Sequence, residues 1–140
     1  MDKFTRNYVI GLIGVLLSGG LVWLLNLDFT AARLNQRLAD VEMIADYPFP
    51  FEVRRIDNGV ATVTTPRSFK VPAVRFVGLL DPQLANKPAD APEVVQAQKQ
   101  MAKVQGKVKE IVLEHPKVAR INWVVDRDWY AQHGIQLSKQ

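Results

Sequence analysis

The chain contains no cysteine. It therefore cannot hold a disulfide framework, a thiolate zinc site, an iron–sulfur cluster or a cysteine nucleophile. The sequence also lacks the glycine-rich patterns GxGxxG and GxxxxGK[ST], so it has neither a dinucleotide-binding fingerprint nor a P-loop. These absences exclude several common classes of enzyme before any fold is considered.

Side chains for acid–base or nucleophilic chemistry are scarce as well. Ser68 lacks the glycine elbow of a hydrolase nucleophile. His115 and His133 each fall at an expected helix end, where an imidazole interacts with the helix dipole. Asp126 and Asp128 could form a metal pair, but they lack the other ligands of a calcium loop and suit a helix N-cap and first turn. We expect no catalytic residue, no metal and no cofactor.

Charge is missing from residues 7–27, which read NYVIGLIGVLLSGGLVWLLNL. As a helix these 21 residues would span about 31 Å, close to the ~30 Å hydrocarbon core of a bilayer. We therefore expect a transmembrane helix over residues 8–27. The alternatives are a buried soluble helix and a cleaved signal peptide with a weak cleavage site at residues 30–32. The apolar run is longer than a signal peptide requires.

The distribution of lysine and arginine predicts the orientation in the membrane. Lys3 and Arg6 precede the span, and Arg33 and Arg37 follow it. The terminal amine and the shortness of the tail favour a cytoplasmic tail over residues 1–7 and an exported C-terminal domain. In a bacterium this would be a single-pass protein of the inner membrane with a periplasmic domain. The net charge of +4 suits a position beside anionic lipid and is no nucleic-acid signature.

Small residues line one face of the expected membrane helix. Gly11, Gly14 and Ser18 lie at positions i, i+3 and i+7, and small side chains allow a second helix to approach closely in lipid. This face predicts docking of a partner helix or of a second copy of the chain. The alternative is that glycine is simply frequent in membrane helices.

The segment after the span predicts a first helix and then a compact domain. Residues 28–46 carry an apolar stripe at helical spacing, formed by Ala31, Leu34, Leu38, Val41 and Ala45. No proline or glycine separates this stalk from the span, so the membrane helix could continue into it. The prolines at positions 48 and 50 end it. Residues 47–140 then form one α+β domain.

The pattern of the domain predicts about four strands. Asn58-Gly59 favours a type I′ hairpin, which pairs Asp57 with Val60, Ile56 with Ala61 and Arg55 with Thr62. A third strand is expected over residues 71–79, where Val74 and Phe76 alternate with Arg75, and a fourth over residues 118–125.

Two further helices complete the prediction. The longer one, over residues 92–114, should begin with a capping box of Asp90 and Glu93 and be interrupted by Gly106. The shorter one, WYAQH, should end at Gly134. The predicted fold class is α+β, with an antiparallel sheet packed by two helices in the order α-β-β-β-α-β.

Two groups of side chains in the domain are candidates for a partner surface. Lys99, Lys103 and Lys107 recur every fourth residue along the long helix, although such a row is commonly a solvated face. Trp129 and Tyr130 could be interface anchors if they are exposed.

The sequence therefore favours a single-pass, non-catalytic accessory or interaction subunit of a larger membrane complex. Its partners would be membrane proteins, bound through the span and the exported domain, and the bilayer itself; nucleic acid is not expected, and a homodimer is compatible. One alternative is a tethered module that binds envelope lipid or cell-wall polymer. The last is a small metal-dependent enzyme.

Overall fold

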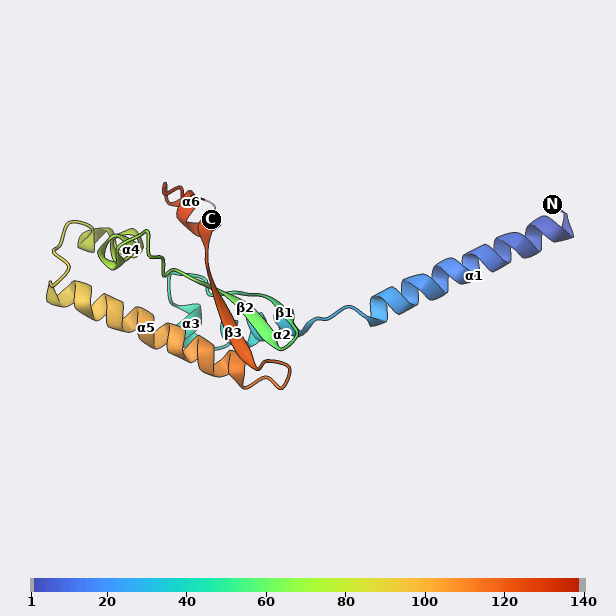
Figure 1. Ribbon diagram of the computed structural model, residues 1–140, viewed down its shortest axis with the longest axis horizontal. Coiled ribbons are helices and arrows are strands. Elements are labelled where there is room, and N and C mark those ends of the chain that lie inside the picture. Colours follow the sequence, from blue (N-terminus) through green and yellow to red (C-terminus); the bar gives the residue numbers. More distant parts are fainter. Residues whose placement is uncertain (1, 139–140) are drawn as a thin grey trace.

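Figure 1 shows the computed structural model, which describes residues 2–138. Its helices are α1 (Lys3–Leu25), α2 (Thr30–Ala39), α3 (Glu42–Ala45), α4 (Ala73–Leu80), α5 (Pro92–Leu113) and α6 (Arg127–Gln132), with a 3₁₀ turn at Pro82–Leu84. Its strands are β1 (Val53–Asp57), β2 (Val60–Thr65) and β3 (Arg120–Val125). The architecture is a mixed α+β domain preceded by one apolar helix.

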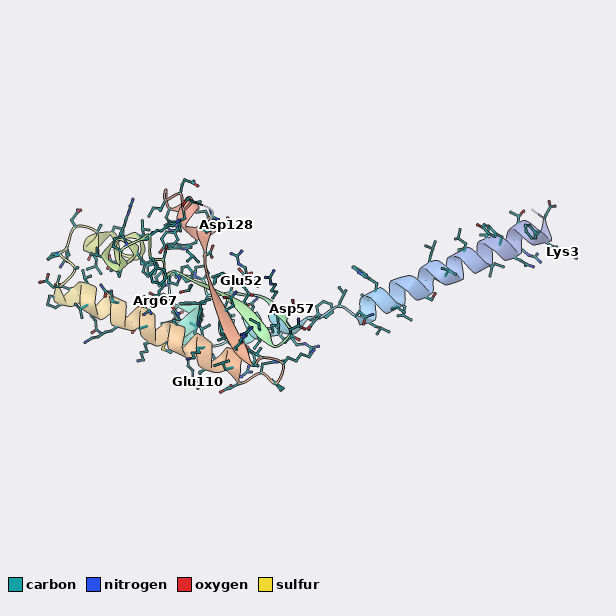
Figure 2. The ribbon with its side chains drawn as sticks, viewed as in Figure 1. Lys3, Glu52, Asp57, Arg67, Glu110 and Asp128 are labelled. Carbon is teal, nitrogen blue, oxygen red and sulfur yellow. The ribbon has the colours of Figure 1, made fainter. Side chains whose placement is uncertain are left out.

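Helix α1 projects away from the domain (Figures 1 and 2). It has 23 residues and a mean hydropathy of 2.2 over its most apolar window, and no part of that window is buried in the chain. It is therefore long and apolar enough to cross a membrane, which is consistent with a single-pass membrane protein. Because it is unburied, it is not a core helix of this domain.

Helix α1 does not continue into the stalk, contrary to one expectation from the sequence. The side chain of Asn26 donates to the carbonyl of Val22 at 2.9 Å, at the end of α1. Asp28 then accepts hydrogen bonds from the N–H and the hydroxyl of Thr30. Because these bonds stabilise the carboxylate, they lower the pKa of Asp28. The side chains of Asn26 and Asp28 thus hydrogen-bond to groups of nearby residues, in place of a continued helix ladder. Helix α1 therefore ends here, and α2 begins at Thr30.

The predicted stalk helix is also divided, into α2 and α3. Val41 has an extended conformation (φ −94°, ψ 109°), and helix geometry resumes after it. Leu34 and Leu38 are buried as expected, but the break turns Ile44 into the core and leaves Ala45 exposed. The regular stripe predicted through position 45 is therefore wrong at its end.

The hairpin at Asn58-Gly59 is confirmed, including its register. Both residues have positive φ, 48° and 78°, as a type I′ turn requires. The pairs are Asp57 with Val60, Ile56 with Ala61 and Arg55 with Thr62.

The sheet has three strands among the described residues, in the order β1-β2-β3, instead of about four. It is also mixed: β1 and β2 are antiparallel, but β3 pairs parallel to β2. A parallel neighbour requires a long crossover connection, and the chain between Thr65 and Arg120 supplies it through α4 and α5. The predicted purely antiparallel sheet is therefore wrong.

The expected strand over residues 71–79 is helix α4. The carbonyl of Pro72 accepts from the N–H groups of Arg75 and Phe76, which starts the helix. Phe76 and Val77 are buried while Arg75 is exposed, so this segment packs with a helical face. The alternation of Val74 and Phe76 with Arg75 is compatible with both structures.

The long helix α5 is confirmed, but its predicted capping box is not. Ala91 is the N-cap and no side chain caps it. Glu93 instead pairs with Lys87 at 3.1 Å; its pKa is lowered first by its own backbone N–H and then by Lys87. Along the helix the buried face contains Val94, Met101, Val104, Val108 and Ile111.

One face of the sheet is covered by α5, and the other face is exposed only in part. Thr65 donates to Gln105 of α5 at 3.0 Å, which identifies the face that α5 covers. Arg120 of β3 pairs with Val60, and Val60 with Asp57 of β1, so all three lie on the opposite face. Arg120 and Asp57 are exposed there, but Thr62 and Thr64 of β2 lie on the same face and are buried. This face is therefore exposed to solvent mainly near the hairpin.

Candidate functional site

The most exposed aromatic side chain of the domain lies in the loop between β2 and α4. Phe69 has a relative exposure of 112%. The loop is held at its start, because the hydroxyl of Tyr130 donates to the carbonyl of the buried Pro66. The N–H of Val71 then donates to the carbonyl of Ser68 at 3.4 Å. The narrow turn that this bond closes projects Phe69 outward. The exposure of this ring is therefore set by ordered neighbours.

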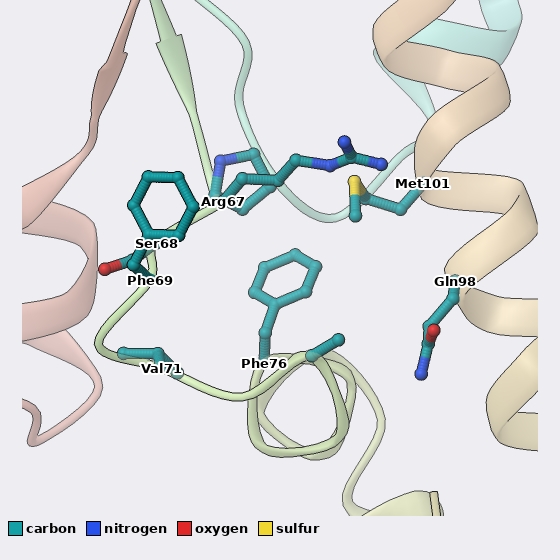
Figure 3. Close-up of a pocket in the computed structure, with 9 residues that line it drawn as sticks. Arg67, Ser68, Phe69, Val71, Phe76, Gln98 and Met101 are labelled. Atoms are coloured by element: carbon teal, nitrogen blue, oxygen red, sulfur yellow. The ribbon is translucent and has the colours of Figure 1, made fainter. Parts of the chain in front are cut away.

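A cavity of about 380 Å³ opens beside this loop. Figure 3 shows Arg67 extending from the end of β2 toward α5, and Phe76 of α4 facing it. Met101 and Gln98 form the wall on α5. The cavity therefore combines an apolar interior with one guanidinium group, an arrangement typical of binding sites with few polar groups.

A second hollow of about 230 Å³ shares Arg67 with the first. It lies between α5 and β3 and is lined by Gly106, Lys109 and Trp123, among others. A Cβ atom added at Gly106 would meet nothing within 4 Å, so the missing side chain leaves this hollow open. We call the two hollows together the α5 groove.

The α5 groove is basic. Arg67 and Lys109 both line it, and no carboxylate of the described residues forms an ion pair with either of them. Two cations near apolar surface attract a ligand that carries negative charge.

The groove and Phe69 lie at the end of the domain away from α1. Lys117 pairs with Asp28 at 3.8 Å, and Ala119 donates to the carbonyl of Gly59, so the starts of β2 and β3 face α1. Both strands run away from it in parallel, and at ~3.3 Å per residue β2 covers roughly 17 Å. In Figure 2 Arg67 accordingly lies farther from α1 than Asp57.

The predicted lysine row lies on α5 but is not a uniform set of free cations. Lys99 and Lys103 are exposed, whereas Lys107 is half-buried and pairs with Glu110 at 3.0 Å. None of the three lines either hollow. The basic side chains of the groove, Arg67 and Lys109, are different ones.

Trp129 and Tyr130 are core residues in the structure. Trp129 is 6% exposed and Tyr130 is 0% exposed. Trp129 packs edge-on against Phe49 with ring centroids 5.3 Å apart, and burial raises the pKa of Tyr130 to about 12. They therefore form no surface patch: Trp129 packs in the core, and the hydroxyl of Tyr130 holds the start of the loop that carries Phe69.

The acidic and histidine candidates have structural partners. Asp126 is the N-cap of α6: it accepts from the N–H of Trp129 at 3.0 Å and pairs with Arg54 at 3.4 Å. Asp128 is in the first turn of α6 and is exposed. His115 accepts from the N–H of Lys117. Across residues 2–138 no three metal-binding side chains cluster.

The small-residue face of α1 is open in this structure. A Cβ at Gly11 or Gly14 would meet nothing within 4 Å, and Ser18 donates to the carbonyl of Val15 within its own helix. The face is therefore available for packing by another helix, and its use remains a prediction.

Comparisons with protein-family models, curated proteins and solved structures found no match. The candidate site therefore depends on its geometry. Sequence reasoning missed Phe69 and the α5 groove, although one signal for the loop was present: PRSFKVP places an aromatic residue among charged and polar ones between two prolines.

Proposed function

We propose that this chain is a single-pass, membrane-anchored and non-catalytic subunit whose exported domain docks on a partner protein through Phe69 and the α5 groove. Its N-terminus is cytoplasmic in this proposal. The main observation in support of this proposal is that Phe69 is fully exposed beside an apolar cavity. An aromatic side chain next to a pocket is the usual form of an interface anchor.

The unburied helix α1 supports the same proposal. An apolar helix with no contact inside its own chain must be covered by lipid or by another helix, since exposure of this surface to water is unfavourable. The Gly11, Gly14 and Ser18 face allows a helix of the partner to pack closely. Anchor and domain would then bind the same complex.

Binding of envelope lipid or cell-wall polymer has less support. Its aromatic component is lost, because Trp129 and Tyr130 are buried. The exposed lysines Lys99 and Lys103 remain, but a row of lysines on a helix is commonly a solvated face.

Gentle-detergent purification of the tagged full-length chain from its native membrane tests the proposal. Mass spectrometry would quantify the proteins that co-elute in stoichiometric amount, for the native chain and for Phe69→Ser. Leu113→Ser is the control, since Leu113 is also apolar, is 37% exposed and lines neither hollow.

We expect a stoichiometric partner that Phe69→Ser loses and Leu113→Ser keeps. Loss of an anchor worth about 2 kcal/mol weakens binding roughly 30-fold. A chain that elutes alone from its native membrane, or a partner equally retained by both variants, would refute docking through Phe69.

A further inference from the structure

The two outer edges of the sheet differ in how they are protected. At the β1 edge, the side-chain amide of Asn35 in α2 donates to the carbonyl of Val53 at 2.9 Å and accepts from its N–H at 2.7 Å. The same strand contains a bulge between Val53 and Arg55. Bulges and covering helices are the usual devices that prevent a further strand from pairing. The β1 edge is therefore closed.

The β3 edge has neither of these devices. The N–H groups of Arg120 and Asp126 donate to carbonyls of Gly59 and Thr65, on the side of β2. Because backbone direction alternates along a strand, the N–H and C=O groups of the odd-numbered residues point away from β2. These residues are Ile121, Trp123 and Val125. No hydrogen bond to their outward groups is present within residues 2–138, and β3 contains neither proline nor lysine.

This open edge borders the α5 groove. Trp123 of β3 lines the hollow together with Gly106 and Lys109 of α5. A strand edge beside a helix forms a channel in which a peptide can pair with the strand and place alternate side chains against the helix. The absence of a side chain at Gly106 leaves space in this channel.

We propose that the β3 edge binds an extended, acidic peptide segment of the partner protein as an added strand lying along the α5 groove. The inference rests on the proposed function, since it names the part of the partner that docks. Backbone groups of Ile121, Trp123 and Val125 bind the peptide, and Lys109 and Arg67 select carboxylate side chains. Phe69 contacts the partner beyond the end of this segment.

Charge favours an acidic segment over a second copy of this chain. Pairing of two β3 edges would bring two copies of the basic groove together, including Arg67 and Lys109 from each. Like charges placed opposite one another across a new interface are unfavourable. The net charge of +4 gives the same preference over longer range.

A random library of eight-residue peptides, selected on the full-length chain in nanodiscs, tests the inference. Selected peptides would be measured on the native chain, on Gly106→Leu and on Gln100→Leu. The first variant fills the channel, and the second adds the same side chain at an exposed position of α5 that lines neither hollow. NMR of the full chain in micelles would report amide exchange at Ile121, Trp123 and Val125.

We expect peptides that alternate apolar residues with Asp or Glu and bind at least 10-fold more weakly to Gly106→Leu, with no change for Gln100→Leu. Bound peptide should slow exchange of the three outward amides. Selection of no peptide, or of peptides that leave these amides unprotected, would overturn the inference. Protection of the amides without peptide in a dimeric chain would assign the edge to a second copy instead.

The outcome is distinguishable from that of the proposed function. If no acidic peptide binds while Phe69→Ser still removes a co-purifying partner, the subunit proposal stands and the strand-addition proposal fails. If peptides bind as expected but the chain always elutes alone, the peptide site stands and the docking proposal fails.

Discussion

Two glycines inside helices should respond differently to the same substitution by alanine. Gly106 lies in α5, and an added Cβ would meet nothing within 4 Å. Gly78 lies in α4, and an added Cβ would lie 2.7 Å from the Cα of Ala85. Neither glycine has positive φ. The backbone conformation therefore tolerates alanine at both positions, and the difference is steric.

The expected magnitudes follow from this difference. Alanine is favoured over glycine in a helix interior by about 1 kcal/mol, so Gly106→Ala should raise the free energy of unfolding by about that amount. At Gly78 the same gain is opposed by overpacking, which costs roughly 1–3 kcal/mol. We therefore expect Gly78→Ala to be neutral or to destabilise by up to about 2 kcal/mol.

Urea unfolding of the full chain in micelles, followed by tryptophan fluorescence, to which the buried Trp129 contributes, would measure both variants. The midpoint should rise for Gly106→Ala and should not rise for Gly78→Ala. Destabilisation by Gly106→Ala would mean that α5 is not packed as described and would refute the reasoning about the open hollow. A clear gain in stability for Gly78→Ala would show that α4 does not approach Ala85 closely.

Three further predictions concern the elements that position the site. The free energy of unfolding should fall as the pH rises from 10 to 12. The reason is that Tyr130 ionises near the ordinary tyrosine pKa of 10.0 in the unfolded chain, whereas burial keeps its pKa at about 12 in the folded chain. Titration of the urea midpoint with pH would measure this fall, which should be smaller in Tyr130→Phe. Asn35→Ala should destabilise by roughly 2 kcal/mol, because both backbone groups of Val53 lose their partner, and an unchanged urea midpoint would contradict this. Asp126→Ala should cost about 1 kcal/mol through the lost N-cap, whereas retained cellular function in Asp126→Asn would argue against an enzyme.

Local chemistry made several elements predictable from the sequence. The turn at Asn58-Gly59 requires positive φ at both positions, and this requirement fixes the hairpin and its register. Asp126 and Gly134 delimit α6 by the usual cap chemistry: the carboxylate accepts from Trp129, and Gly134 has φ of 79°. Such signals depend only on neighbouring residues, which is why they survive folding unchanged.

The errors arose where several structures fit one local pattern. Residues 71–79 alternate in polarity and also contain a helical face, and only the packing of Phe76 and Val77 against the core selects the helix. The parallel position of β3 depends on a crossover of more than fifty residues between Thr65 and Arg120. No local sequence pattern indicates which edge of the hairpin a later strand will join.

The candidate site was even less accessible to sequence reasoning, because exposure is a property of the whole fold. Phe69 and Trp129 are both aromatic residues near charged neighbours, yet one is fully exposed and the other is 6% exposed. The groove depends on the placement of Gly106 beside β3. Gly106 appeared in the sequence only as an interruption of a helix, and its structural consequence is open space.

The topology of the sheet also bears on the choice between a protein partner and a lipid surface. If α1 is a membrane anchor, a module that binds the lipid beside it should present apolar and basic groups near Asp28. Such groups do lie there, since Phe29 is 56% exposed and Lys117 pairs with Asp28. The groups of the proposed docking site, Phe69 and Arg67, instead follow the end of β2 that points away from α1. Because β2 and β3 run in parallel, both the loop after β2 and α6 lie at this distal end. If α1 crosses a membrane, the proposed docking site faces away from it, so a protein partner at this site would have to extend beyond the membrane surface.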